Sequence, residues 1–333
     1  MFVLWSCQQN PAKERDAFLL RGNLKLEAGE HQEALRYYTE AIKTDPNAAD
    51  AYNNRGIAFA EIGRLPEAIT DYSRAIQSRP AYVDAYYNRA DAYYQKSDYV
   101  RSLVDLDTVL RYYPDSAYVY FSRGLSLTGL RQYEDAQQTF TQAIRLDPLN
   151  AESFVNRATV YYYQQAYNEA RQDIREAIKL DAEESNAYNV LGLLFTDTQQ
   201  YDSAKIAFQQ ALQLEPYQPY FLNNQAYLYL QMDSLELAQS ELTQSMRLNP
   251  RNSYVYRNQG ILYLKKGQLE DATRLLRRAI ELDSATQEAY YYLGNAYLEM
   301  DQISDACAAW EKSIESGHAQ AQKIYQLHCR SDV

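Results

Sequence analysis

The chain has 333 residues, of which 46% are hydrophobic and 23% charged, and its formal net charge is −11. This composition indicates a folded protein whose acidic surface repels phosphate backbones, so a nucleic-acid partner is not expected. The length exceeds what one hydrophobic core usually supports, and no run of 18 apolar residues suggests a membrane span. With 11 Gly and 9 Pro, the chain is too poor in turn residues for an all-β fold.

The first element is a short segment, residues 1–14. It begins MFVLWSCQQN, and the stretch LWSC, ending at Cys7, resembles a bacterial lipobox, in which the cysteine is lipidated. Only six residues precede Cys7 and none is basic, so most of such a signal is missing. We favour a shortened lipoprotein signal with a polar tether, which places the protein at a bacterial cell envelope, lipid-anchored and facing the periplasm or the outside. The alternative is an ordinary N-terminal end on a cytoplasmic protein.

From residue 15 onward, small residues recur every 34 residues. One series of Gly or Ala runs from Gly22 to Gly294. A second series lies twelve residues later, from Ala34 to Ala306, and contains only Ala except at Ser102. Proline recurs with the same period at positions 46, 80, 114, 148, 216 and 250. Nine units therefore run in register over residues 15–320, and we number positions within each unit from 1 to 34.

The fourth unit shows the full pattern, at unit positions 4, 8, 11, 20, 24, 27 and 32: Tyr120, Gly124, Leu127, Ala136, Phe140, Ala143 and Pro148. This pattern resembles the tetratricopeptide repeat (TPR) family. The resemblance implies an all-α, right-handed superhelical solenoid of nine helix-turn-helix repeats with a concave groove. Residues 321–333 are expected to form a capping helix that covers the last repeat, because a solenoid end needs one.

The spacing independently predicts two packed helices per unit. Positions 4, 7, 8 and 11 share one face of the first helix, and positions 20, 23, 24 and 27 share one face of the second. Arginine at position 7 is then expected to form an ion pair with aspartate at position 23 of the facing helix, in preference to an anion site. The predicted pairs are Arg55 with Asp71, Arg89 with Asp105, and Arg157 with Asp173, whereas Arg123 faces Thr139 and lacks an acid.

A second face of the first helices, at positions 2, 5, 6, 9 and 12, lines the groove in TPR proteins. Asparagine at position 6 both donates and accepts hydrogen bonds, which suits the backbone of an extended peptide. Aspartate at position 2 of the first three units forms an acidic row that favours a basic segment, and aromatic side chains would anchor it. The alternative is that these are merely solvated helix residues. The candidate partner-binding residues are Asp16, Asn23, Asp50, Asn54, Asp84, Tyr87, Asn88, Asp91, Tyr94, Tyr118, Phe121, Asn156, Tyr162, Asn224 and Asn258.

No catalytic motif is convincing. Residues 105–109 read DLDTV, similar to the nucleophile motif of haloacid-dehalogenase-type phosphatases, but on a helix the two carboxylates point about 200° apart. The three histidines lack metal-ligand spacing, so neither a metal nor a cofactor is expected. We therefore predict a non-enzymatic scaffold that binds an extended partner segment. The alternatives are an assembly lipoprotein that acts through its convex face and a regulatory subunit of an enzyme.

The two remaining cysteines lie near the C-terminal end. If Cys7 is lipidated, Cys307 and Cys329 lie in an oxidising compartment. The capping helix is expected to pack on the second helix of the last unit, which would bring these two side chains close enough to form a disulfide.

Overall fold

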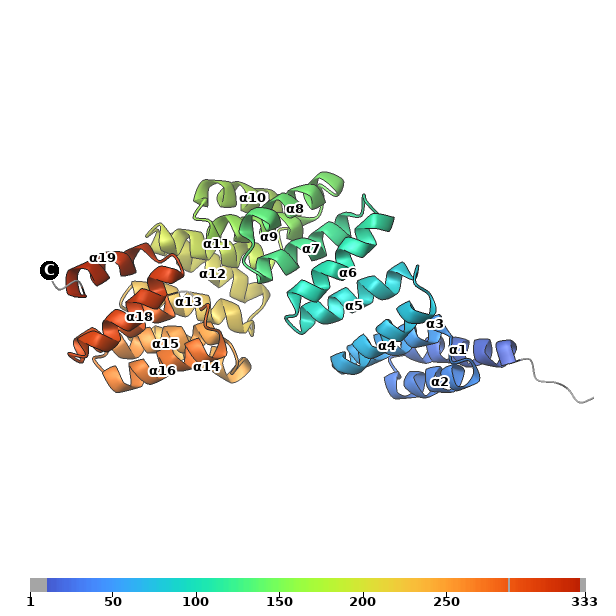
Figure 1. The fold of residues 1–333 in the computed structure, drawn as a ribbon. Helices are drawn as coiled ribbons and strands as arrows, with labels where there is room; N and C mark the ends of the chain where they lie inside the picture. The colour runs from blue at the N-terminus through green and yellow to red at the C-terminus, as the bar shows by residue number, and fades with distance from the viewer. Residues whose placement is uncertain (1–10, 287, 330–333) are drawn as a thin grey trace, which may run out of the picture. The chain divides into compact units, whose positions relative to one another are not determined.

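The computed structural model describes residues 11–286 and 288–329, which contain nineteen α-helices and no β-strand (Figure 1). The chain divides into two compact units, an N-terminal unit up to Ala166 and a C-terminal unit from Tyr167. The predicted all-α repeat fold is confirmed. The N-terminal unit holds α1 (Pro11–Glu27), α2 (His31–Thr44), α3 (Ala49–Glu61), α4 (Leu65–Ser78), α5 (Val83–Gln95), α6 (Tyr99–Tyr112), α7 (Ala117–Gly129), α8 (Tyr133–Leu146) and α9 (Ala151–Tyr163). The C-terminal unit holds α10 (Tyr167–Leu180), α11 (Ser185–Asp197), α12 (Tyr201–Leu214), α13 (Pro219–Gln231), α14 (Leu235–Leu248), α15 (Ser253–Lys265), α16 (Leu269–Leu282), α17 (Ala289–Glu299), α18 (Ile303–Glu315) and α19 (Ala319–His328).

The helices follow the 34-residue period. In each described repeat the first helix ends at unit position 13 and the second begins at position 17. The turn between them passes through position 15 with a positive φ, as at Gly63 (φ 75°) and Ser97 (φ 59°). Glycine adopts this backbone without steric cost, while other residues reach it at a cost of about 1 kcal/mol. One turn geometry therefore serves repeats with different residues at this position.

Small residues at position 8 let the two helices of a repeat approach closely. A Cβ added to Gly124 would lie 2.6 Å from a ring carbon of Phe140, so the aromatic ring occupies the space that a side chain would need. Where position 8 is alanine, the facing residue is a smaller aliphatic one, as in the cluster of Ala90 with Leu106. The aromatic rings thus stand opposite glycine, while leucine is found opposite both alanine and glycine, as at Gly260 and Leu276.

Proline at position 32 is not needed to end the second helix. In the fifth and eighth units Ala182 and Ser284 stand where other repeats have proline. Nevertheless α10 ends at Leu180 and α16 at Leu282, the same unit position as in proline-containing repeats. Packing against the following first helix therefore sets the end of the second helix, and proline only reinforces it.

The first helices of neighbouring repeats contact one another directly within each unit. Such contacts join α1 to α3, α3 to α5 and α7 to α9, and likewise α11 to α13, α13 to α15 and α15 to α17. Within each unit, second helices pack between consecutive first helices, as α4 does against α3 and α5 and α14 does against α13 and α15. The first helices therefore form the inner, concave layer of each unit, and the second helices form the outer layer.

The last helix packs against its predecessor. Ala321 of α19 is fully buried in a cluster with Trp310 and Leu293, and Ile324 and Tyr325 pack against the same cluster. A disulfide joins Cys307 of α18 to Cys329, with a Cα–Cα distance of 5.7 Å, within the usual range for such a bond. The helix α19 thus covers apolar surface at the end of the C-terminal unit and is held there covalently.

Candidate partner-binding surface

Arginine at position 7 joins neighbouring repeats of the N-terminal unit. Arg89 donates through Nε and Nη2 to both carboxylate oxygens of Asp105, each at 2.8 Å, and through Nη1 to Ser73 Oγ at 2.9 Å. The Asp105 side chain is only 3% exposed. Because Ser73 belongs to the preceding repeat, the arginine binds across the repeat boundary as well as within its own hairpin. Arg55 makes the same three contacts, with Asp71 at 2.7 and 2.8 Å and Thr39 at 3.1 Å.

The contact with the preceding repeat was not predicted from the sequence. It also corrects the expectation that Arg123 lacks an acidic partner, because Arg123 donates to Asp107 of the preceding repeat at 2.9 Å and to Thr139 at 2.9 Å. Helical periodicity pairs position 7 only with position 23 of the facing helix. The second partner stands at position 25 of the preceding repeat. The predicted pair of Arg157 with Asp173 would join residues of the two units, and it stays a prediction.

Most of the asparagines predicted to contact a peptide form hydrogen bonds with other asparagines. Asn88 donates through Nδ2 to Asn53 Oδ1 of the preceding repeat at 3.0 Å, and Asn53 donates to Asn54 at 3.1 Å. Asn54 in turn donates to Asn23 at 2.9 Å. A second series in the C-terminal unit runs from Asn258 to Asn223, Asn224 and Asn189, with donor–acceptor distances of 2.9, 3.3 and 3.0 Å. We call these two series the asparagine ladders.

The ladders change the interpretation of position 6. Asn258 is fully buried, so it has no surface to offer a partner and the expectation that it contacts one is wrong. Asn23, Asn54, Asn88 and Asn224 remain partly exposed, but their amides already have partners. The physical reason is that consecutive first helices touch, which places position 6 of one repeat against the repeat before it, at position 5 for Asn88, Asn224 and Asn258 and at position 9 for Asn54.

Arginines partly neutralise the predicted acidic row. Asp16 accepts from Arg15 at 2.7 Å, and Asp50 accepts two hydrogen bonds from Arg79 at 3.0 and 2.6 Å. The Arg79 contact lowers the pKa of Asp50 below its ordinary value, against the opposing effect of burial. Asp84, also exposed, completes the row on α5. The row therefore carries less net charge than its sequence suggests.

Two further candidate residues lie near the end of the N-terminal unit. Asn156 is partly exposed and donates to the backbone oxygen of Glu152 in its own helix at 2.9 Å. The Tyr162 ring lies 5.7 Å from the ring of Tyr163, which stacks on Tyr133 at 5.2 Å. Aromatic side chains therefore continue along α9, but the asparagine serves its own helix.

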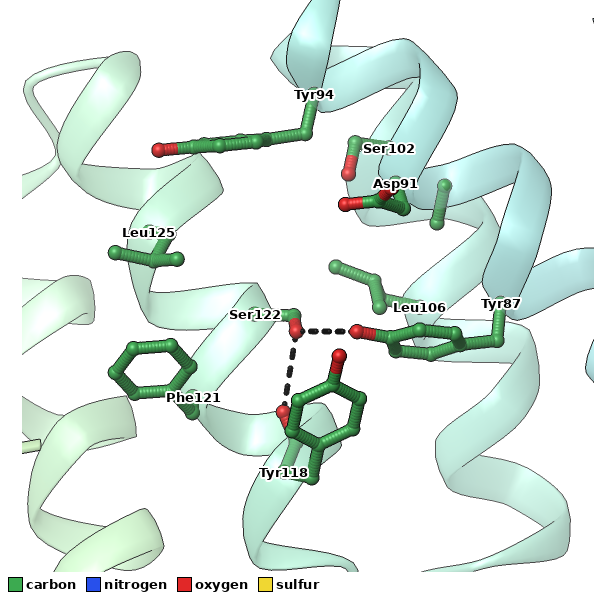
Figure 2. A pocket seen from close by; sticks show the side chains of 10 residues that line it. Tyr87, Asp91, Tyr94, Ser102, Leu106, Tyr118, Phe121, Ser122 and Leu125 are labelled. Carbon is green, nitrogen blue, oxygen red and sulfur yellow. Dashed lines mark hydrogen bonds between the residues drawn. The ribbon is translucent and has the colours of Figure 1, made fainter. Parts of the chain in front are cut away.

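Five of the predicted residues line one pocket between α5 and α7 (Figure 2). It has a volume of about 110 Å³, and its floor is formed by buried residues of α5 and α6, Ala90, Ser102 and Leu106. Figure 2 shows the rings around a common space, with the Asp91 carboxylate at its edge. The predicted residues that line it are Tyr87, Asp91, Tyr94, Tyr118 and Phe121, joined by Ser122 and Leu125.

The pocket walls are fixed by hydrogen bonds and ring contacts. Tyr87 Oη lies 2.9 Å from Ser122 Oγ, and either atom can be the donor. The Tyr87 and Tyr118 rings lie 5.0 Å apart, and Tyr118 remains 63% exposed. Burial raises the pKa of Tyr87 well above its ordinary value and also raises that of Tyr94, and the nearby Asp91 carboxylate acts in the same direction. Asp91 is the one acidic side chain among the lining residues, so it supplies the negative charge of the pocket.

The C-terminal unit holds a buried charged cluster that the sequence did not indicate. Arg257 is 7% exposed and donates to Asn258 Oδ1 at 2.8 and 3.0 Å, and its guanidinium lies 5.3 Å from the Tyr227 ring and 5.1 Å from the Tyr254 ring. Its Nη1 is 3.6 Å from Glu288 Oε2. The arginine is thus enclosed by aromatic rings and lies beside the Glu288 carboxylate.

Glu288 reaches this cluster from an unusual backbone position. Its φ is 62°, in the left-handed region, and α17 begins only at Ala289, unit position 3. Its Oε1 lies 3.7 Å from Nε2 of His318, the residue that caps α19. Burial alone would raise the pKa of Glu288, but the His318 hydrogen bond and the Arg257 charge hold it below its ordinary value. The only sequence signals were departures from the repeat pattern at Ser284 and His318.

Other predicted features can be placed only in part. Cys7 lies outside the described residues. Among the residues that are described, no helix combines the length and apolarity needed to cross a membrane. In the same part of the chain, no three His, Cys, Asp or Glu side chains gather as metal ligands would.

The stacked hairpins, with their first helices as an inner layer, define the chain as an α-helical solenoid built from 34-residue repeats. A family described as tetratricopeptide repeat matches residues 19–83, 67–117, 87–151, 121–172 and 155–219, and related TPR families match 219–252, 241–274, 260–301 and 288–316. The chain therefore belongs to the tetratricopeptide repeat family. No curated protein matches it.

Solved structures share the fold at low sequence identity. A tetratricopeptide repeat protein from Parabacteroides merdae is 17% identical, with a TM-score of 0.63 over 74% of this chain and 98% of its own. A structure of the APC/C hetero-tetramer Cut9–Hcn1 is 15% identical, with a TM-score of 0.63 over 97% of this chain and 65% of its own. Pseudomonas aeruginosa pilF is 20% identical, with a TM-score of 0.54 over 65% and 99%. At such identities the likeness establishes the fold alone.

Proposed function

We propose that this protein is a non-enzymatic scaffold that holds an extended segment of a protein partner on the concave face of its N-terminal unit. The pocket between α5 and α7 carries this proposal, because it gathers five predicted groove residues at one point. At about 110 Å³ it is well below the roughly 300–1,000 Å³ of small-molecule sites, so it suits a side chain of a larger partner.

The chemistry of this surface favours a segment with both basic and apolar residues. Tyrosines make effective anchors because they bury much area and lose little conformational freedom. Tyr118 is 63% exposed and therefore able to bury more surface on binding. The Asp84 and Asp91 side chains add negative charge nearby, which speeds association with a basic segment and makes it sensitive to salt.

Site-specific crosslinking tests the proposal. A photoreactive phenylalanine at Tyr118, on the inner helix α7, should give a discrete crosslinked partner in cells. The matched control places the same group at Val104, which is 62% exposed on the outer helix α6. Phe121→Ala should reduce the crosslink from position 118. Equal crosslinking from both positions, or crosslinking from position 104 alone, would instead support a role for the convex face.

We also propose that the protein works in an oxidising compartment such as a bacterial cell envelope. The Cys307–Cys329 disulfide supports this, because such bonds persist in secreted or periplasmic proteins and are rare in the cytosol. Thiol labelling of the protein directly from its native cells should leave both cysteines unmodified until a reductant is added. Full labelling without reductant would place the protein in a reducing compartment.

A further inference from the structure

We propose that the pocket between α5 and α7 binds a lysine side chain of the partner, with the ammonium group between the aromatic rings and the Asp91 carboxylate. This inference rests on the proposed function and specifies the partner residue that enters the pocket. It follows from three observations: the rings that enclose the space, the single charge at its edge, and the way the pocket replaces part of an asparagine ladder.

The first observation is the arrangement of aromatic rings. Tyr87 and Tyr94 of α5 stand opposite Tyr118 and Phe121 of α7, around the space that Figure 2 shows. The Tyr87–Tyr118 ring contact and the Tyr87–Ser122 hydrogen bond fix two of these rings before any ligand enters. Aromatic faces attract a cation through their quadrupole, by about 0.5–1 kcal/mol at exposed sites and more when water is excluded.

The second observation is the charge balance of the pocket. Asp91 is the one acidic residue among the ten that line it, and none of the ten is basic. Elsewhere in the N-terminal unit arginines already occupy comparable positions, as at Arg55 and Arg89, which lie near aromatic rings and pair with carboxylates of their own repeats. In the pocket the rings and a carboxylate are present and none of the lining residues is a cation, so a cationic side chain of a partner can take that place.

The Asp91 carboxylate favours lysine over arginine. Its Oδ2 already accepts a hydrogen bond from Gln95 Nε2 at 2.7 Å. A guanidinium binds best to both oxygens of a carboxylate at once, whereas an ammonium group is a compact charge that needs only one. The buried side chains of Ala90 and Leu106 at the pocket floor also provide apolar contact for the methylene groups of a lysine.

The third observation explains why the pocket lies between these repeats. In three of the four contacts between repeats in the ladders, position 6 of one repeat bonds to position 5 of the repeat before, as Asn88 does to Asn53. The exception is Asn54, which bonds to Asn23 at position 9. Between the third and fourth repeats the same two positions carry Ser122 and Tyr87, which form the equivalent hydrogen bond at 2.9 Å. The hydrogen bond between the two repeats is thus preserved, but by the short Ser122 and the long aromatic Tyr87 in place of two asparagines. The short serine leaves open the space that a second asparagine would fill.

Small probes test this inference on the full chain. Increasing concentrations of Nα-acetyl-lysine amide should shift the NMR signals of Tyr94 and Tyr118 until the shifts saturate. Single Tyr→Phe variants assign these signals. The norleucine amide and the Nε-acetylated lysine amide lack the positive charge, so each should bind more weakly than the lysine amide by about two- to fivefold. The arginine amide should bind no more tightly than the lysine amide.

Variants then identify the residues responsible. Asp91→Asn should weaken lysine-probe binding by about two- to fivefold, the effect expected for one partly exposed charge. The control Asp135→Asn removes an exposed aspartate of the outer helix α8, which lies outside the pocket and outside the candidate partner-binding residues, and it should leave binding unchanged. Thermal melts of both variants should match the parent, since both side chains are exposed.

Several results would overturn the inference. Equal binding of norleucine and lysine probes would show an apolar pocket, and tighter arginine binding would reverse the stated preference. An equal loss in Asp135→Asn and Asp91→Asn would reflect general surface charge. If no probe shifts the tyrosine signals while position 118 still crosslinks to a partner, the lysine inference fails and the scaffold proposal stands.

Discussion

The buried pair of Arg89 and Asp105 allows a sharp test of how neighbouring repeats are held together. Asp105 is 3% exposed and Arg89 18%, so Asp105→Ala would leave a largely buried guanidinium with Ser73 as its remaining hydrogen-bond partner. Removing one member of a buried pair costs about 3–5 kcal/mol. The residual exposure of Arg89, and the Tyr86 ring 5.6 Å from its guanidinium, place the expected loss near the lower end, about 3 kcal/mol.

The same helix supplies the control. Asp107 accepts from Arg123 at 2.9 Å, but its side chain is 58% exposed, so Asp107→Ala should cost about 1 kcal/mol or less. Denaturant unfolding of the two variants compares a buried and an exposed acid two residues apart on α6. Replacing Arg89 and Asp105 together, by Met and Leu, should recover much of the loss, because no unpaired charge remains. Equal losses for Asp105→Ala and Asp107→Ala, or no recovery in the double variant, would refute the reasoning.

Three further changes test other features of the fold. Cys329→Ser removes the disulfide between residues 22 apart in sequence, and thermal melts should show a loss of stability of about 3 kcal/mol. A reductant should destabilise the parent by the same amount and leave the variant unchanged. Gly124→Ala places a Cβ 2.6 Å from the Phe140 ring and should cost about 1–3 kcal/mol in denaturant unfolding; a loss under about 0.5 kcal/mol would mean that the ring moves aside freely. Glu288 has a lowered pKa in the folded state, so its contribution to stability is present above its ordinary value of 4.5 and is lost as the pH falls through the folded-state value. Unfolding measured from pH 7 to pH 3 should therefore decline less steeply in Glu288→Gln than in the parent, and parallel curves would count against this.

The sequence predicted those contacts that lie within one repeat. Positions 7 and 23 face each other across a single hairpin, so helical periodicity alone was enough to pair Arg89 with Asp105. Periodicity could not reveal the bond to Ser73, because it depends on how far one hairpin is displaced and rotated against the next. The same limit applies to the asparagines at position 6, whose partners belong to the preceding repeat. Glu288 was missed because a left-handed residue before α17 breaks the period from which the predictions were made.

The contact between position 5 and position 6 of the next repeat connects the stability of this protein with its proposed binding. Where both positions are asparagine, as at Asn53 and Asn88, side-chain amides join two repeats and little surface is left for a partner. At Tyr87 and Ser122 the same contact persists through hydroxyl groups, and the aromatic ring forms the wall of a pocket. In the C-terminal unit the corresponding position 5 holds Arg257, whose guanidinium is buried among tyrosines beside Glu288. A solenoid can therefore change what it binds at one repeat boundary without loosening its stack, provided that these two positions still form a hydrogen bond.

Ser122→Ala tests this requirement, because it removes the hydroxyl without filling the pocket. It should lower the affinity for the lysine probe through a less fixed Tyr87 ring, and cost about 1 kcal/mol of stability, the usual value of one hydrogen bond.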